Sequence, residues 1–172
     1  MNAHIGDSEK TCAELLGHGN AHEVDCPVGP LSIQRHSHIS EPWCRMAQSC
    51  GCLARREVVV PEFYDHKKEE SAFLDVLFMG HPDFPYFLGD VIIINPAAKR
   101  YQPGAAKVPG YAAIRAADEK HRRYPTKRGV GMVPLVQEAY GRLGEEAEDT
   151  LTRLAVAHSR KSRRKGLPQA TR

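Results

Sequence analysis

Two aspartates interrupt the two most apolar stretches of this chain. Asp75 lies within the run 72–78, and Asp90 lies within the run 86–94, fifteen positions later. A carboxylate in an apolar stretch of strand-forming residues is costly to bury unless a cation neutralises it. On adjacent strands of a hairpin, the two carboxylates would be able to share one divalent cation, and Mg²⁺ is commonly held by one or two carboxylates. The alternative is that both aspartates lie at strand ends or in turns and face water.

The spacing of apolar residues and the turn signals predict the order helix, three strands, helix, strand, helix. The first helix is expected to begin near Glu41, with Ser40 as its N-cap, and to end at Gly51. Strands are expected at residues 55–60 (stopped by Pro61), 72–78, 86–94 and 129–136. Further helices are expected over 111–124 and 145–158. This order predicts an α/β fold in which a mixed central β-sheet of about four strands is flanked by helices.

The length of 172 residues fits a single domain with flanking tails. Residues 1–30 are expected to be a disordered N-terminus with a possible Cys/His knuckle, residues 31–158 to form the α/β domain, and residues 159–172 to form a disordered basic tail. No stretch approaches 18 apolar residues and the N-terminus has no secretory apolar core, which predicts that the protein is neither membrane-spanning nor secreted. Five cysteines without the spacing of a secreted scaffold indicate reduced thiols and an intracellular location.

The net charge is +3, but acidic and basic residues are concentrated in different segments of the chain. Residues 1–98 hold 7 Lys and Arg against 14 Asp and Glu, whereas residues 99–128 hold 9 basic and 2 acidic residues. The segment 158–172 adds 6 basic residues and no acidic one. Clustered cations of this kind are the electrostatic footprint of a polyanion-binding protein, and phosphate contacts dominate nucleic-acid affinity. The alternative is a solvated helix face followed by a disordered tail.

The first segment of the chain carries four residues of the types that bind zinc. They are Cys12, His18, His22 and Cys26. Two thiols and two imidazoles can form a tetrahedral zinc site, but a Cys-x-x-Cys pair, which would make the signal strong, is missing. Ligand-free Cys and His residues in a glycine-rich segment are the alternative.

Several short motifs follow one another in order along residues 12–157. His22-Glu-Val-Asp-Cys-Pro-Val-Gly29 precedes Arg35-His36-Ser37, and Leu74-Asp75-Val76 precedes a second Asp on a strand that ends in Asn95-Pro96. The later motifs are 119–124 (Glu-Lys-His-Arg-Arg-Tyr), 133–136 (Val-Pro-Leu-Val), 141–144 (Gly-Arg-Leu-Gly) and 153–155 (Arg-Leu-Ala). In this order and spacing the chain resembles the restriction-endonuclease-like domain at the C-terminal end of site-specific non-LTR retrotransposon polyproteins.

The resemblance implies a nuclease core of the PD-(D/E)xK type that uses Mg²⁺ or Mn²⁺. Asp75 and Asp90 would hold the metal, and Glu57 would assist from the preceding strand, unless it forms a surface ion pair with its arginine neighbours. The lysine that usually follows the second acid by two residues is absent, because Ile92 occupies that position. In this retrotransposon family the lysine can instead come from the following helix, and Lys120 matches that position. A cation there can orient the attacking water or stabilise charge on the phosphate. A solvated lysine on a helix face is the alternative.

The resemblance and the basic segments together predict DNA, or RNA, as the partner. The candidate contact residues are Arg35, His36, Arg115, Arg122, Arg123, Lys127 and Arg128. A reverse transcriptase precedes this domain in such elements, so the chain is expected to be a terminal piece or a truncated copy of a longer polyprotein, located in the nucleus if the source is eukaryotic. The alternatives are a non-catalytic nucleic-acid-binding remnant of such a domain and an unrelated α/β scaffold for protein contacts.

Overall fold

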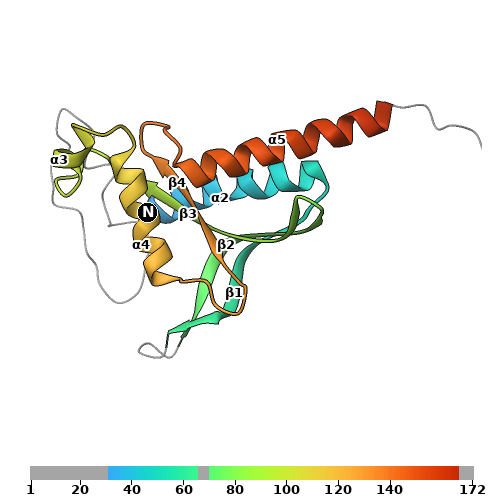
Figure 1. Ribbon diagram of the computed structural model, residues 1–172, viewed down its shortest axis with the longest axis horizontal. Coiled ribbons are helices and arrows are strands. Elements are labelled where there is room, and N and C mark those ends of the chain that lie inside the picture. Colours follow the sequence, from blue (N-terminus) through green and yellow to red (C-terminus); the bar gives the residue numbers. More distant parts are fainter. Residues whose placement is uncertain (1–30, 66–69, 167–172) are drawn as a thin grey trace, which may run out of the picture.

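The computed structural model describes residues 31–65 and 70–166 (Figure 1). Its elements are α2 (Leu31–Cys50), β1 (Leu53–Asp65), β2 (Glu70–His81), β3 (Phe84–Ile94), α3 (Gln102–Ala105), α4 (Tyr111–Arg123), β4 (Met132–Glu138) and α5 (Glu145–Gly166). The mixed α/β fold with a four-stranded sheet flanked by helices is therefore confirmed. The predicted element order also holds, with the short α3 added inside the expected connection between β3 and α4.

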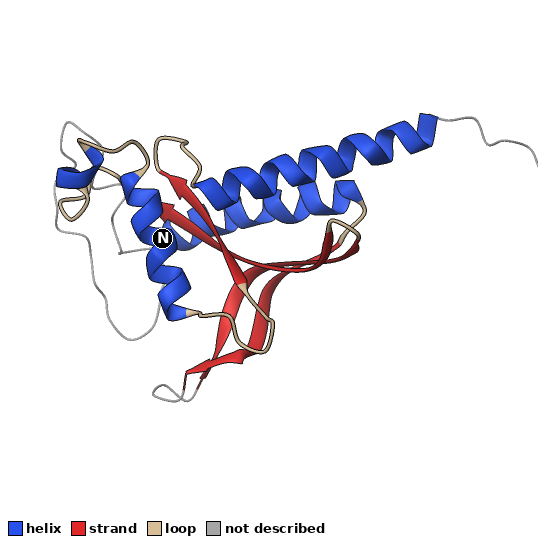
Figure 2. Cartoon of the chain, viewed as in Figure 1, coloured by secondary structure: helices blue, strands red, loops and turns tan. Residues whose placement is uncertain are grey.

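The sheet has the strand order β1-β2-β3-β4 (Figure 2). β1, β2 and β3 pair antiparallel, and β2 and β3 form the expected hairpin, whose last pair before the turn is His81 with Phe84. β4 pairs parallel to β3, and the connection between them contains the helix α4, because parallel neighbours need a crossover connection. The acids of β2 and β3 therefore lie on adjacent strands in the middle of the sheet.

The end of β3 is covered by helices on both faces. Val91 packs in one core cluster with residues of α2 and α5, including Trp43 and Leu154. Ile94 packs in another cluster with Ala112 and Ala116 of α4. Because successive side chains of a strand point to opposite faces, α4 lies across the sheet from the α2–α5 pair, and α2 and α5 run side by side (Figure 1). This layering places α4 and α2 within reach of the same part of β3.

The first helix begins ten residues earlier than predicted. α2 starts at Leu31 and continues through Pro42, so Ser40 is not an N-cap but a buried helical residue whose hydroxyl donates to the carbonyl of Ser37 at 3.3 Å. The sequence signal for a cap was wrong because burial of one helix face outweighs the local cost of proline. The predicted end is confirmed, since α2 ends at Cys50 and Gly51 has a φ of 102°.

β1 is also longer than predicted, because it passes through Pro61 and ends at Asp65. β1 is an edge strand of the sheet, and a proline is tolerated there when its missing N–H lies on the unpaired side. The added length carries Phe63 into a third core cluster, which also contains Val60, Leu77 and Leu88.

The boundary predicted at residue 158 is not a structural boundary. α5 continues to Gly166, into the segment for which the sequence predicts a disordered tail. Two contacts hold this extension: Arg160 Nη1 lies 3.2 Å from Asp83 Oδ2 in the β2–β3 turn, and Lys161 Nζ donates to the carbonyl of Ser49 at 2.8 Å. These contacts to distant residues are invisible in the local sequence pattern.

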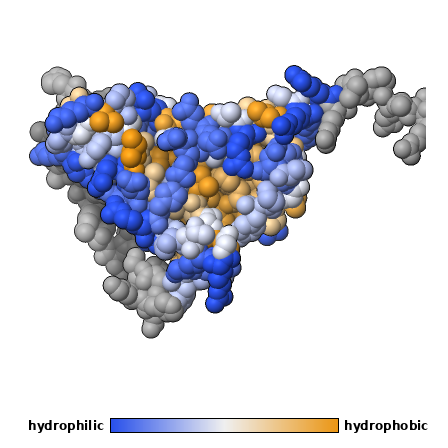
Figure 3. Space-filling view, in the orientation of Figure 1, coloured by the Kyte–Doolittle hydropathy of each residue, from blue (hydrophilic) through white to orange (hydrophobic). Residues whose placement is uncertain are grey.

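The surface carries exposed apolar side chains, and the described cysteines are buried. Apolar side chains gather in the middle of the face seen in Figure 3 and hydrophilic ones border them; the exposed apolar residues of the sheet are Leu53, Val59, Tyr64, Phe73 and Tyr86. The cysteines within the described ranges, Cys44, Cys50 and Cys52, are buried free thiols. Within the same ranges, no helix is both long enough and apolar enough to cross a membrane.

Candidate active site

Asp75 lies where β2 separates from β3. The last pair that the two strands form at this end is Val76 with Gly89, and the same register continued by one residue places Asp75 opposite Asp90. The backbone N–H of Val91 donates to Asp75 Oδ2 at 2.5 Å. The carboxylate thus satisfies a β3 donor that has lost its partner strand, which explains physically why an acid is tolerated at this position.

Asp90 is the most deeply buried acid of this site, with 6% of its surface exposed. The Lys120 ammonium, from the last turn of α4, forms an ion pair with Asp90 Oδ2. Burial raises the pKa of Asp90, Lys120 opposes that rise, and the charge of Asp75 and a side-chain hydrogen bond with it raise the pKa further. The two carboxyl groups are therefore close enough to interact directly.

The buried oxygen of Asp90 is incompletely satisfied. Lys120 contacts Asp90 Oδ2 as an ion pair, yet within the described ranges no donor meets this oxygen with regular hydrogen-bond geometry. The charge of the ammonium nevertheless compensates this carboxylate, which would be costly to bury without a partner. A buried oxygen that already accepts one cation is a natural ligand for a metal cation.

His36 reaches Asp75 from α2. Its Nε2 lies 3.0 Å from Asp75 Oδ2. The hydrogen bond to Asp75 raises the pKa of His36, burial opposes this, and the charges of Asp75 and Asp90 add to the rise. Each acid of the pair therefore has a basic partner, and the four side chains come from four elements: α2, β2, β3 and α4.

The donor set at this site fits Mg²⁺ or Mn²⁺. Two carboxylates on adjacent strands supply the hard oxygen ligands that these ions prefer, and the poorly satisfied Asp90 Oδ2 is one of them. The described ranges contain no group of three or more His, Cys, Asp or Glu side chains placed to hold a metal ion. Mg²⁺ commonly takes only one or two carboxylates and completes its shell with water and substrate phosphate.

Glu57 lies opposite Asp75 in the β1–β2 pairing, and Ile92 follows Asp90 by two residues on β3. Glu57 is exposed and has a left-handed φ of 54°. Ile92 is partly buried against the α4 cluster, where the usual lysine of the motif would stand. A role for Glu57 remains a prediction, and Lys120 is the lysine that the fold brings to the acids.

The predicted nucleic-acid contacts on and after α4 are exposed. They are Arg115, Arg122, Arg123, Lys127 and Arg128. Arg122 Nε donates to the carbonyl of Asp118 at 3.2 Å, and the Arg123 guanidinium lies 5.2 Å from the centre of the Tyr124 ring. His121, between Lys120 and Arg122, instead contacts Glu146 at 2.8 Å. Exposed cations therefore continue from the site residue Lys120 into the loop that follows α4.

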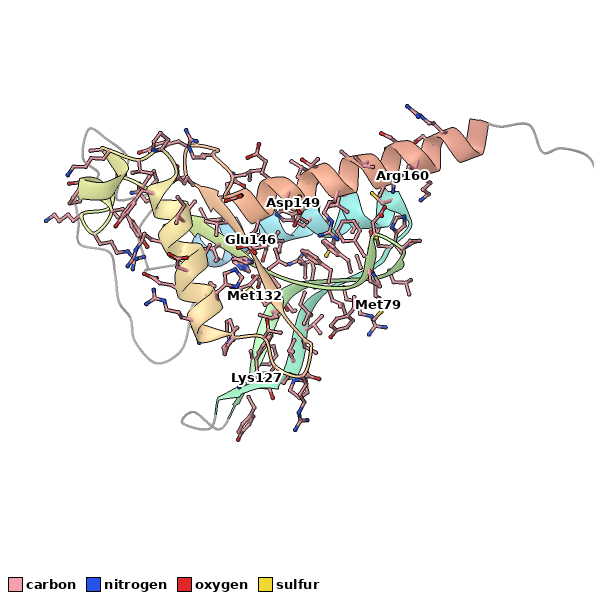
Figure 4. All side chains as sticks on the ribbon, in the orientation of Figure 1. Met79, Lys127, Met132, Glu146, Asp149 and Arg160 are labelled. Atoms are coloured by element: carbon pink, nitrogen blue, oxygen red, sulfur yellow. The ribbon has the colours of Figure 1, made fainter. Side chains whose placement is uncertain are left out.

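That loop ends in a tight turn that presents two cations. The backbones of Lys127 and Val130 exchange hydrogen bonds of 3.0 and 2.8 Å, and the two residues between them, Arg128 and Gly129, have φ values of 52° and 78°. Two positive φ values are typical of a type I′ turn, which arginine adopts only with strain. Figure 4 shows Lys127 at the far end of this loop, away from Glu146 at the start of α5.

The remaining predicted site residues cannot be placed. Cys12, His18, His22 and Cys26, the candidate zinc ligands, lie outside the described residues. The side chain of Arg35, which precedes His36 in α2, is also outside the described part. The zinc site and the Arg35 contact therefore stay predictions.

The sequence pattern did not reveal the role of His36 beside Asp75. We expected His36 to contact nucleic acid, and no local spacing links it to an acid 39 positions later. The link arises because α2 packs on the strands that carry the acids. Comparison of the sequence with known family models and with curated proteins gives no match. The function is therefore inferred from the geometry of the site and from the order of the motifs.

Proposed function

We propose that this chain is a divalent-metal-dependent DNA endonuclease domain of restriction-endonuclease-like type, derived from a retrotransposon. The observation that carries the proposal is the position of Asp75 and Asp90. The register places them opposite each other where β2 and β3 separate, and Lys120 of α4 contacts the second acid. Two neighbouring carboxylates can hold the metal for phosphodiester hydrolysis, and a lysine beside them can stabilise charge on the phosphate.

Each side chain of the cluster has a distinct task in this proposal. Asp75 and Asp90 would hold Mg²⁺ or Mn²⁺, which supplies Lewis-acid polarisation of the phosphate and a lowered pKa for bound water. Lys120 brings a positive charge to the same carboxylate cluster, where it stabilises negative charge that develops on the phosphate. The Val91 N–H and His36 hold Asp75 in place.

The exposed cations of α4 and its following loop would bind the DNA backbone. Arg115, Arg123 and Arg128 are exposed, and they lie on the same continuous stretch of chain as Lys120. Contacts to phosphates give affinity that does not depend on base sequence and that falls steeply with salt. Retrotransposon origin also implies a nuclear location in a eukaryotic cell and a reverse transcriptase as the partner in a longer polyprotein.

The decisive experiment is nicking of supercoiled plasmid DNA by the purified chain. We expect open-circular DNA to form in Mg²⁺ or Mn²⁺ and not in EDTA, and we expect Asp75→Ala and Asp90→Asn to lower the rate at least about 100-fold. Asp118→Asn is the matched control, because Asp118 is an exposed acid on the helix of Lys120 and should leave the rate unchanged. Wild-type protein that shows no divalent-dependent nicking at any concentration contradicts the proposal.

A second candidate function is supported by the basic partners of the two acids. His36 contacts Asp75 and Lys120 contacts Asp90, so the cluster is balanced within the chain itself. A nucleic-acid-binding remnant without catalysis would retain such a balanced cluster for stability alone. It predicts salt-sensitive DNA binding without cleavage, with an affinity that Asp90→Asn does not change. An α/β scaffold for protein contacts would instead bind DNA no better at low salt than at high salt.

A further inference from the structure

One oxygen of Asp75 receives two donors from two different elements. His36 Nε2 on α2 lies 3.0 Å from Asp75 Oδ2, and the Val91 N–H on β3 donates to the same oxygen at 2.5 Å. Two donors on one oxygen restrict rotation of the carboxylate about its Cβ–Cγ bond. Both donors meet Oδ2, and neither of them meets Oδ1.

The position of His36 is set by the packing of α2. Ser40, one turn later, is buried, and Trp43, Cys44 and Ala47 pack in the core cluster that also contains Val91. The helix that carries His36 is therefore anchored to the strand that carries Asp90. A side chain on a rigid element can hold a ligand more accurately than one on a loop.

The alternative role for His36 is contact with nucleic acid, which its place in the Arg35-His36-Ser37 segment implies. The imidazole is partly exposed, with 40% of its side-chain surface accessible. Its Nε2, however, is directed to the acid and lies at hydrogen-bond distance from Asp75 Oδ2. The geometry favours a task inside the chain.

We propose that His36 is a positioning residue of the metal site: its Nε2–H holds Asp75 Oδ2, so that Oδ1 is available for the cation shared with Asp90. This inference rests on the metal site of the proposed function. Side chains that hydrogen-bond a metal-ligating carboxylate orient it, and their loss typically lowers metal affinity by about 10- to 100-fold. Only one N–H donor is required, so a glutamine, whose amide can reach the position of Nε2, should replace the histidine.

The test measures Mn²⁺ binding to the metal-free full-length chain, by the electron paramagnetic resonance signal of unbound Mn²⁺. We expect His36→Ala and His36→Phe to weaken binding about 10-fold or more, and His36→Gln to stay within about threefold of the wild type. Phenylalanine fills the volume of the imidazole but has no donor, so His36→Phe distinguishes the effect of losing the hydrogen bond from the effect of losing side-chain packing. His38→Ala, an exposed histidine on the same helix, is the matched control and should bind Mn²⁺ like the wild type. Thermal melts followed by circular dichroism identify any variant that fails to fold.

The possible outcomes separate this inference from the endonuclease proposal. Wild-type affinity for Mn²⁺ in His36→Phe, or an equal loss in His36→Gln and His36→Phe, overturns the positioning role. A fall in DNA affinity of His36→Phe in EDTA, with Mn²⁺ binding unchanged, identifies a nucleic-acid contact instead. Weaker Mn²⁺ binding in a chain that nicks no DNA upholds the role of His36 and contradicts the endonuclease. A wild-type chain that binds no Mn²⁺ overturns both.

Discussion

Lys120 and Asp90 form a largely shielded ion pair that joins α4 to β3. The Asp90 side chain is 8% exposed and that of Lys120 is 26% exposed. α4 lies in the connection between the parallel strands β3 and β4. The ion pair therefore fastens this crossover helix to the strand that precedes it. The lysine therefore has a structural task in addition to the catalytic task that we propose.

Replacement of Lys120 should make the fold depend on divalent metal. Lys120→Met leaves Asp90 buried beside Asp75 with no cation, and we expect a loss of about 2 kcal/mol in the free energy of unfolding. Mg²⁺ should then raise the melting temperature of Lys120→Met by more than that of the wild type, because a bound ion restores the missing charge. Thermal denaturation without MgCl₂ and with about 10 mM MgCl₂, a concentration that exceeds a weak Kd, measures the shift in melting temperature. An equal Mg²⁺ effect in both proteins would show that a bound ion does not replace the charge of Lys120.

Substitutions of Asp75 should separate its structural task from the catalytic task that we propose for it. Asp75→Ala removes the acceptor of the Val91 N–H and of His36, so we expect a loss of about 1–3 kcal/mol in the free energy of unfolding. Asp75→Asn retains an acceptor oxygen and should lose less stability, yet it should abolish nicking as completely as alanine does. Urea unfolding and the plasmid assay measure the two effects, and nicking by Asp75→Asn at the wild-type rate would exclude Asp75 as a metal ligand.

Replacement of Arg128 should change stability and DNA affinity in opposite directions. Arg128 has a φ of 52°, which glycine adopts without strain, so we expect Arg128→Gly to stabilise the fold by about 0.5–1 kcal/mol. If the turn contacts a phosphate, the same change should weaken DNA binding and lower the slope of log K against log [salt] by about 1. Binding measured at several salt concentrations gives the slope, and Arg45→Ala, an exposed arginine on α2, is the control. An unchanged slope would remove Arg128 from the DNA interface.

Gly89, the neighbour of Asp90, should tolerate no side chain. A Cβ at this position would lie 2.7 Å from Val76 Cγ2 and 2.8 Å from Leu135 Cδ1, both in the packed core. We expect Gly89→Ala to cost about 1–3 kcal/mol in the free energy of unfolding, because core atoms must move. In the control Gly131→Ala the nearest atom is the Thr126 hydroxyl oxygen, at 3.2 Å in an exposed loop, and the cost should be smaller. Urea titration measures both values; equal losses would show that the strand is not packed as described.

The buried thiol of Cys44 should resist alkylation in the folded protein. Burial raises the pKa of Cys44, and nearby Glu41 adds to the rise while Arg56 opposes it. The folded thiol thus stays protonated at a pH where the unfolded thiol ionises, so this group lowers the stability of the fold as the pH rises through the unfolded pKa of about 8.5. We expect iodoacetamide at about pH 8.5 to modify Cys44 at least about 10-fold faster in urea than in buffer. Mass spectrometry of the Cys44 peptide gives the rates, and equal rates would mean that the thiol is accessible.

Local patterns in the sequence predicted much of the fold and part of the candidate site. Two apolar runs rich in β-branched and aromatic residues, bounded by turn signals, located the hairpin that carries Asp75 and Asp90, because such signals are carried by neighbouring residues. The spacing of apolar residues located the helix with Lys120, whose buried face contains Ala112, Ala113 and Ala116.

Contacts between distant residues were decided by the tertiary structure alone. The start of α2 ten residues before its predicted start, the passage of β1 through Pro61 and the extension of α5 to Gly166 all depend on packing or strand position that local propensity does not contain. The contact of His36 with Asp75 has the same origin.

The sequence by itself therefore determined which strands carry the two acids and which helix carries the lysine. Only the tertiary structure decided that β2 leaves β3 beside Asp75, that this carboxylate takes over the Val91 N–H, and that His36 meets it from α2. The physical reason is that hydrophobic periodicity is a local property of the chain, whereas the partner of a buried charge is set by which elements pack together around it.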